Sequence, residues 1–237
     1  MRRTLTGSLF WFVLFYLSLT VLAAETTEIE AALAAIGNGS AEEIKTRLCI
    51  DRITVFDDQA RAQAIAALPA VLREHRMTQG KLLRRIEPIL HQVLQLHGRT
   101  RALQQPELFL FAHELPTAQI WRGSVLLVST SLAETLYDGE LAGIFAHELS
   151  HAYFEDEMAA AQRTRDERAM RTVELKCDGL AIISLRLLGY KPTSYLSSLQ
   201  RLQLLTKRLG RSSGILQSHP ELAVRAQFSE RLIKALG

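Results

Sequence analysis

The chain has few of the features that mark disulfide scaffolds, nucleic-acid-binding proteins or multi-span membrane proteins. Only 2 of its 237 residues are cysteine, and its 28 basic and 25 acidic residues give a formal net charge of only +3. We therefore expect no nucleic-acid partner. Repeats and low-complexity tracts are absent, and no internal apolar run is long enough for a membrane span. The length suits one globular core, with room for an accessory subdomain.

The two cysteines leave two interpretations open. In an oxidising compartment, a disulfide between Cys49 and Cys177 would tie the N-terminal helices to the helix that carries Cys177. The alternative is a pair of buried thiols, because the sequence gives no distance between the two side chains.

The N-terminus resembles an export signal. Arg2 and Arg3 precede the apolar run Leu9 to Ala24, which ends in small residues. We expect residues 1–24 to be a signal peptide, cleaved after Ala23 or Ala24, and the mature protein to be periplasmic or secreted with a formal charge of +1. The run is shorter than the roughly 20 residues that span a bilayer comfortably. The alternative is an uncleaved N-terminal anchor that holds the protein on the periplasmic side of the membrane.

Residues 25–105 form a predicted N-terminal helical segment. Pro69 should break one of its helices, and a longer amphipathic helix is expected from about Gln79 to His97. His91 and His97 on this helix are interpreted as structural. The polar stretch Gly98 to Glu107 is the best linker candidate, since the hydrophobic period changes after it.

Residues 106–237 begin with short β-like runs and then return to helical periodicity. Three short strands are predicted, with Gly123 at a turn between the last two; they are Leu108–Glu114, Gln119–Arg122 and Ser124–Val128. The predicted fold class is α+β, mainly helical, with an approximately three-stranded sheet beside the helix that carries the most informative motif.

That motif is His147-Glu148-Leu149-Ser150-His151, an H-E-x-x-H sequence. On a helix, positions i and i+4 share one face, so His147 and His151 could reach a single Zn²⁺ while Glu148 stands beside its open position. The preceding residues support a helix, because they carry apolar side chains at helical spacing and Asp138 is a plausible N-cap. The alternative is a solvated helix turn without a metal.

A third ligand is available 23 residues after His151. Glu174 and Asp178 lie one turn apart in a stretch with helical character. Glu174 would complete a His₂Glu set, and Asp178 could hold a ligand imidazole through its second nitrogen. Taken alone, this pair would indicate only an exposed acidic turn.

These residues resemble the zinc metallopeptidases that include the CAAX prenyl protease and HtpX, within the gluzincin clan. The resemblance covers roughly residues 80–237 and continues through Gly189-Tyr190-Lys191-Pro192, Ser218-His219-Pro220 and Arg225. It implies a zincin-like metallopeptidase domain at 106–237 that binds one Zn²⁺ per chain. It also implies the roles of the site residues: His147, His151 and Glu174 as zinc ligands, Glu148 as the general base, Asp178 as the residue steadying His147, and His219 and Arg225 at the cleft.

The chain departs from the family pattern in two places. Thr117-Ala118-Gln119 stands where the substrate-facing edge strand usually carries Asn-Ala, and only Ala152 to Val173 separate the motif helix from the third ligand. His219 has its own alternative, which is to end a loop before the helix that starts at Pro220. If His219 is functional, it stabilises the oxyanion or occupies the open position of the zinc in a resting form.

The predicted function is an exported zinc endopeptidase that hydrolyses unfolded or extended envelope proteins. Its partners would be protein or peptide substrates. The alternative from another class is a protease-like chaperone or binding module of the cell envelope, in which the zinc site is idle or regulated.

Overall fold

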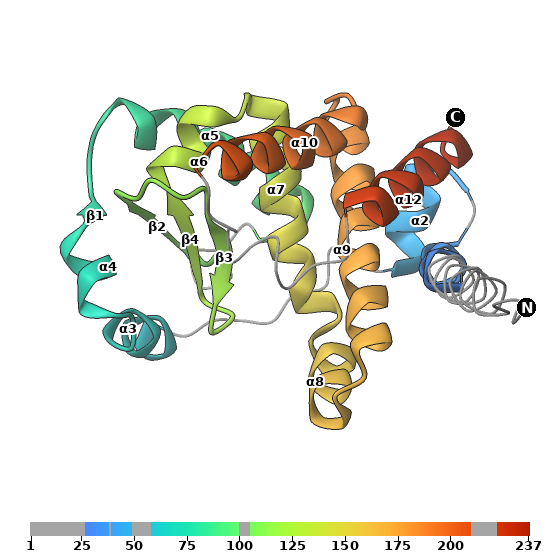
Figure 1. Cartoon of the computed structure of the whole chain (residues 1–237), viewed down its shortest axis with the longest axis horizontal. Helices are drawn as coiled ribbons and strands as arrows, with labels where there is room; N and C mark the ends of the chain where they lie inside the picture. Colours follow the sequence, from blue (N-terminus) through green and yellow to red (C-terminus); the bar gives the residue numbers. More distant parts are fainter. Residues whose placement is uncertain (1–26, 38, 49–57, 100–104, 210–221) are drawn as a thin grey trace, which may run out of the picture.

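The computed structural model describes residues 27–37, 39–48, 58–99, 105–209 and 222–237. Most of this part of the chain is helical, and a small sheet lies at one side (Figure 1). The helices, beside one at residues 27–36, are α2 (Ala41–Leu48), α3 (Asp58–Ala66), α4 (Ala70–Glu74), α5 (Lys81–Leu96), α6 (Thr130–Thr135), α7 (Asp138–Ser150), α8 (Glu155–Thr164), α9 (Glu167–Leu187), α10 (Thr193–Arg208) and α12 (Leu222–Ala235). The strands are β1 (Arg76–Met77), β2 (Glu107–Phe111), β3 (Ala118–Trp121) and β4 (Val125–Ser129). The predicted mainly helical α+β class is confirmed.

The sheet is mixed, with strand order β1-β2-β4-β3. β2 runs parallel to β4, and β3 runs antiparallel to β4 and forms one edge. The expectation of about three strands missed β1, which is antiparallel to β2 and only two residues long, too short to show an alternating pattern. Gly123 has φ 69° in the turn between β3 and β4, as its predicted position requires.

Both faces of the sheet are covered, which explains why β4 is apolar without alternation. Leu126 and Val128 face the main core with α5 and α7, whereas Val125 and Leu127 belong to a smaller cluster with α3. All five residues of β4 are buried.

The amphipathic helix predicted from Gln79 to His97 is observed as α5, and its apolar stripe is buried as expected. The stripe lies in the main core; it comprises Ile86, Ile89, Leu90, Val93 and Leu94. Pro69 precedes α4, so the predicted helix break is also confirmed. Each of these features follows from local sequence chemistry.

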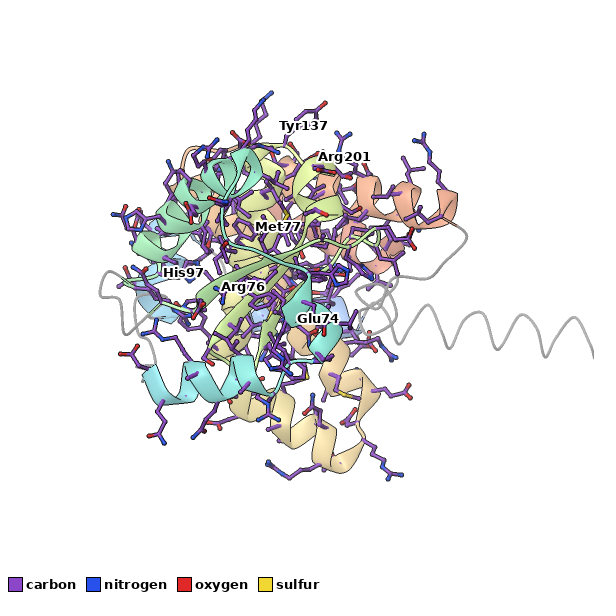
Figure 2. The ribbon with its side chains drawn as sticks, turned by 90° about the vertical axis from the view of Figure 1, so that its left-hand side faces the viewer. Glu74, Arg76, Met77, His97, Tyr137 and Arg201 are labelled. Carbon is purple, nitrogen blue, oxygen red and sulfur yellow. The ribbon has the colours of Figure 1, made fainter. Side chains whose placement is uncertain are left out.

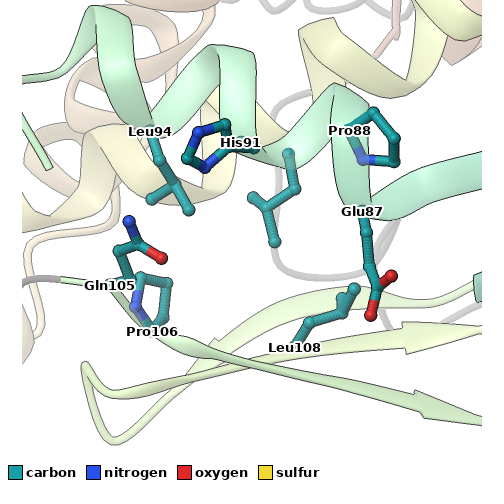
Figure 3. A pocket seen from close by; sticks show the side chains of 8 residues that line it. Glu87, Pro88, His91, Leu94, Gln105, Pro106 and Leu108 are labelled. Atoms are coloured by element: carbon teal, nitrogen blue, oxygen red, sulfur yellow. The ribbon is translucent and has the colours of Figure 1, made fainter. Parts of the chain in front are cut away.

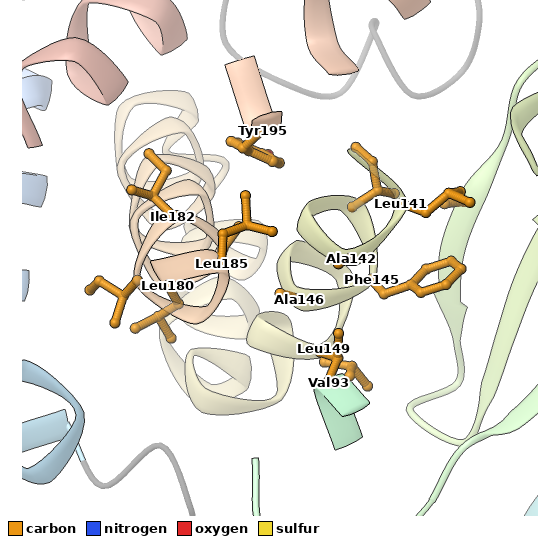
Figure 4. Close-up of a cluster of buried hydrophobic side chains, with 14 of the residues drawn as sticks. Val93, Leu141, Ala142, Phe145, Ala146, Leu149, Leu180, Ile182, Leu185 and Tyr195 are labelled. Carbon is orange, nitrogen blue, oxygen red and sulfur yellow. The ribbon is translucent and has the colours of Figure 1, made fainter. Parts of the chain in front are cut away.

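Helix α7 occupies the centre of the molecule, between β3, α5, α9 and α10 (Figure 1). Small residues allow this close packing: a Cβ added at Gly143 would lie 3.1 Å from the Tyr195 ring and 3.3 Å from Leu185. Figure 4 shows Ala142 and Ala146 on α7 beside the leucine side chains of α9, with Tyr195 of α10 above both. Most of the H-E-x-x-H motif is therefore on a closely packed, buried helix.

The first residue of α7 differs from the prediction. Asp138 is the first helical residue, and Tyr137 occupies the N-cap position, where its N–H donates a 2.8 Å hydrogen bond to Glu140. Asp138 instead accepts hydrogen bonds from Arg85 of α5. The Arg201 guanidinium of α10 lies over the exposed Tyr137 ring and donates a hydrogen bond to Glu140. Figure 2 labels Arg201 and Tyr137 next to each other. These contacts join α5 and α10 to the start of the motif helix.

The N-terminal segment shares the main core with the rest of the chain. Glu28, which is buried, pairs with Arg171 of α9 at 2.8 Å, and Ile36 packs so closely that a Cβ at Gly179 would lie 2.0 Å from its Cδ1. The expected signal peptide at residues 1–24 and the middle of the expected linker lie outside the described residues. Among the helices that are described, none has both the length and the apolar character needed to cross a membrane.

Candidate metal centre

The two motif histidines come from the end of α7 and the residue that follows it. His147 is in the last turn of α7, and His151 continues in αR conformation (φ −56°, ψ −30°) as the first residue of a short 3₁₀ turn. Their rings are 5.1 Å apart and perpendicular. The helical backbone thus places both imidazoles on one side of α7, as the spacing predicted.

Helix α9 brings the third candidate ligand to the same point. Glu174 Oε2 lies 3.4 Å from His147 Nε2 and 4.0 Å from His151 Nε2. One ligand atom from each of the three residues lies within 4.8 Å of the other two. The His147 and Glu174 side chains are only 3% and 7% exposed, whereas His151 is 26% exposed, so the group is open to solvent mainly on the His151 side.

The donor set fits a small divalent cation. Two imidazole nitrogens and one carboxylate oxygen are the ligands of many catalytic zinc sites, and a tetrahedral ion with bonds of about 2.1 Å holds its ligands roughly 3.4 Å apart. The 3.4 Å separation between Glu174 Oε2 and His147 Nε2 matches this spacing, and the 4.0 Å separation between Glu174 Oε2 and His151 Nε2 is somewhat longer. In the absence of a cation, burial disfavours the charged form of His147, but hydrogen bonds to Asp178 and Glu174 outweigh burial and raise its pKa to about 9. A metal ion would therefore displace a proton from this ring.

Asp178 lies behind His147, on the side away from Glu174. Its Oδ1 is 3.0 Å from His147 Nδ1. Burial opposes ionisation of this carboxyl, but the Arg225 guanidinium and the bonds to it hold the pKa of Asp178 well below its usual range. Because an ionised carboxylate only accepts hydrogen bonds, His147 carries a proton on Nδ1 and turns Nε2 toward Glu174.

Arg225 is a buried partner of Asp178. It is 2% exposed and donates two hydrogen bonds to Asp178, from Nε to Oδ2 at 2.8 Å and from Nη2 to Oδ1 at 2.6 Å. Its guanidinium therefore acts on the histidine through Asp178. The sequence motif located this residue near the site but could not show its partner.

Tyr195 is a member of the site that the sequence did not reveal. Its hydroxyl lies 2.6 Å from Asp178 Oδ1 and 2.9 Å from His147 Nδ1, and it accepts a 2.5 Å hydrogen bond from Arg225 Nη2. The ring stacks on His147 at 5.9 Å and is completely buried. The only available signal was its place on the apolar face of α10, four residues before Leu199, which predicts a core position and no hydrogen-bond partner.

Glu148 lies next to His147, His151 and Glu174, which together are called the ligand group, and it contacts the edge strand β3. Its Oε2 accepts a 3.2 Å hydrogen bond from Ile120 N–H, and the residue is 6% exposed. Burial, opposed by His147 and reinforced by Glu174, raises the pKa of Glu148 to about 7. A carboxyl with this pKa can accept and return a proton near neutral pH.

No family model matches the chain, and no curated protein matches it at a significant level. His219, the remaining expected site residue, lies outside the described residues.

Cys177 contributes a further contact that was not expected. Its thiol is buried and free, and Sγ lies 3.6 Å from His151 Nδ1. Burial, with the nearby Glu174 and Asp178 carboxylates, raises the pKa of Cys177 well above its usual value, so the neutral thiol faces the second histidine. Cys49, the other half of the disulfide considered above, is outside the described residues.

A pocket of about 520 Å³ lies away from this site, between α5 and the start of β2 (Figure 3). The residues that line it include Glu87, His91, Gln105 and Leu108, and none belongs to the ligand group. His91 is exposed there and contacts Gln95, as suits a surface residue.

Proposed function

We propose that this chain is a zinc-dependent endopeptidase of the kind that includes the CAAX prenyl protease and HtpX, with a zincin-like domain. One observation carries the proposal: His147, His151 and Glu174 converge from two helices, and Glu148 is adjacent to them. A chance H-E-x-x-H on a surface helix would not bring a buried carboxylate from a second helix into contact with both imidazoles.

Zinc is the cation that we propose, held by His147 and His151 through Nε2 and by Glu174 through its carboxylate. When bound in such a site, Zn²⁺ polarises a peptide carbonyl and makes water a better nucleophile at neutral pH. Asp178 keeps His147 in the required tautomer, and Arg225 keeps Asp178 ionised. The carboxylates of this region also give the site a negative charge that favours a divalent cation.

Glu148 is the proposed general base. Its pKa of about 7 suits a group that takes a proton from water and later delivers it to the leaving amine. The hydrogen bond from Ile120 fixes the carboxylate at the edge strand, where an extended peptide would pass.

The open edge of β3 supports peptide binding by main-chain pairing. The Thr117 carbonyl accepts a hydrogen bond from Ser129 N–H, whereas Ile120 N–H points to Glu148 and not to β4. Hydrogen-bonded and non-bonded residue pairs therefore alternate along the antiparallel β3–β4 ladder. Ala118 therefore presents its N–H and C=O to the open side, and Ile120 presents its C=O, since its N–H donates to Glu148. Pairing of this kind selects extended chains with little dependence on side chains, which fits unfolded proteins as substrates.

The test is proteolysis of an unfolded substrate by the purified, zinc-loaded mature chain. We expect casein to be cleaved, cleavage to stop with a zinc chelator, and Glu148→Gln to abolish cleavage while zinc is retained. Glu134→Gln, on an exposed glutamate of α6, is the matched control and should remain active. Unchanged cleavage by Glu148→Gln would contradict the mechanism.

The chaperone or binding-module alternative makes a different prediction in the same assay. It predicts that the wild-type chain suppresses aggregation of an unfolded envelope protein and yields no fragments, with or without zinc. The location of the protein can be checked separately by fractionation, where export would place it in the periplasm or the medium and an uncleaved anchor would place it with the membranes.

A further inference from the structure

A small, partly open pocket adjoins the proposed catalytic residues. It is about 10 Å³ in volume, and His147 and Glu148 form part of its wall. The remaining wall is mainly apolar; it includes Ala118, Leu132, Ile144, Leu199 and Leu202. A space of this size holds one water molecule or one methyl group.

The pocket lies where a bound peptide would pass. Ala118 is in the edge strand, two residues before Ile120, whose N–H reaches Glu148. A strand paired with β3 would therefore pass the general base and the pocket within about two residues, because successive residues of a strand are about 3.3 Å apart. A side chain next to the cleaved bond can then enter the pocket.

The chemistry of the wall excludes charged side chains. Arg225 also lines the pocket, but both of its hydrogen bonds to Asp178 are buried, so its charge is already compensated. The Glu148 carboxyl in the wall disfavours an acidic side chain. A basic side chain would have to place its charge among Leu199, Leu202 and the other apolar groups, which is costly without a partner.

The size of the pocket is set by residues that cannot easily move. Leu132, Leu199 and Leu202 are at most 2% exposed and belong to the main core. Interiors of this kind are close-packed, so a larger guest would need its neighbours to shift.

We propose that this pocket restricts cleavage to bonds flanked, on one side, by a small uncharged residue such as alanine, serine or glycine. The inference rests on the proposed endopeptidase function and specifies its substrate class. The fit of one methyl group favours alanine, whereas leucine and phenylalanine exceed the available volume. Leu199 and Leu202 are the specificity-determining residues, because both lie on one face of α10 and close the pocket.

The first experiment maps the bonds that the zinc-loaded wild-type chain cleaves in casein, by mass spectrometry. It then measures kcat/KM on peptides that differ only in having alanine, leucine or phenylalanine at the enriched position. We expect alanine to exceed leucine by at least about tenfold, the range that one or a few extra methylene groups produce in a tight pocket. Equal rates for alanine and leucine would overturn the pocket proposal while leaving the peptidase function intact.

The second experiment enlarges the pocket. Leu199→Ala and Leu202→Ala each remove three carbon atoms from the wall and should shift the preference toward leucine by about tenfold or more. Leu185→Ala is the matched control, because this buried leucine of α9 does not line the pocket, so the preference should stay at alanine. Leu199→Val is the milder variant if an alanine variant does not fold. An unchanged alanine preference in folded pocket variants would overturn the assignment of the wall residues. Cleavage of neither casein nor any peptide would instead refute the peptidase function, and the pocket proposal with it.

Discussion

The Tyr195 hydroxyl lies 2.6 Å from Asp178 Oδ1, although the two residues come from different helices and are 17 positions apart. Asp178 thus receives hydrogen bonds from a tyrosine, an arginine and the motif histidine His147. All of these groups are buried, so the arrangement of His147 depends on contacts behind the ligand group as much as on α7.

Removing the tyrosine hydroxyl should weaken zinc binding without removing a ligand. In Tyr195→Phe, Asp178 loses one donor and His147 loses a polar neighbour, so we expect zinc affinity to fall by roughly 10-fold to 100-fold, as for other partners of metal ligands. Competition with a chromogenic zinc chelator measures the change. Tyr190→Phe is the control, since the Tyr190 hydroxyl donates to Gln92 and not to the site. Equal affinities of Tyr195→Phe and the wild type would show that the hydroxyl does not position the ligand.

Arg225 should be important for folding even without zinc. In Arg225→Met, Asp178 would remain buried without its main cationic partner, and breaking a buried pair in this way costs about 3–5 kcal/mol. Urea unfolding of the metal-free protein provides the measurement. Arg231→Met, on the same helix, removes a pair with the exposed Glu30 and should cost less than about 1 kcal/mol. Similar losses of unfolding free energy in the two variants would show that the buried pair stabilises the fold no more than the exposed pair does.

Much of the fold and of the ligand group could be predicted from local patterns. The i, i+4 spacing of His147 and His151 has a direct consequence on any helix, and the apolar stripe of α5 is equally local. The position of Glu174 could not be predicted from local patterns alone, because it is the packing of α9 on α7 that brings this residue to the histidines. The small residues that permit this packing, such as Gly143, are visible in the sequence, but the helix that they face is not.

The elements that escaped prediction depend on tertiary contacts. β1 exists because two residues pair with β2, and Tyr195 and Cys177 matter because of what lies opposite them. Asp138 was expected to cap α7, yet Arg85 from a distant helix takes its carboxylate and Glu140 bonds to the N-cap residue instead. Sequence spacing carries no information on such partners.

Zinc should stabilise the folded chain through its three proposed ligands. A ligand that binds only the native state raises the free energy of unfolding by about 2.7 kcal/mol at 100 times its dissociation constant. We expect added zinc to raise the melting temperature of the wild type and to have little effect on Glu174→Ala. His113→Ala, which changes an exposed histidine outside the ligand group, should respond to zinc as the wild type does. An undiminished zinc response in Glu174→Ala would remove this residue from the ligand set.

Acid should destabilise the protein through His97, which is buried with Nε2 3.0 Å from Ser184 Oγ and Nδ1 3.0 Å from the Tyr153 hydroxyl. Burial, and then the charges of Arg99 and Lys45, lower the pKa of His97 to about 3. The unfolded chain, with a histidine pKa of about 6.5, therefore binds this proton more readily than the native state does.

It follows that the stability from neutral His97 is present above pH 6.5 and is lost progressively as the pH falls from 6.5 toward 3. The expected loss is about 2 kcal/mol between pH 7 and pH 5. Urea unfolding at pH 7, 6 and 5 measures this loss of stability. Between pH 7 and pH 5, His97→Gln should lose about 2 kcal/mol less than the wild type. The control is His91→Gln, which changes an exposed side chain of α5 and should keep the pH dependence of the wild type. A wild-type pH dependence in a folded His97→Gln variant would mean that other groups cause the acid sensitivity.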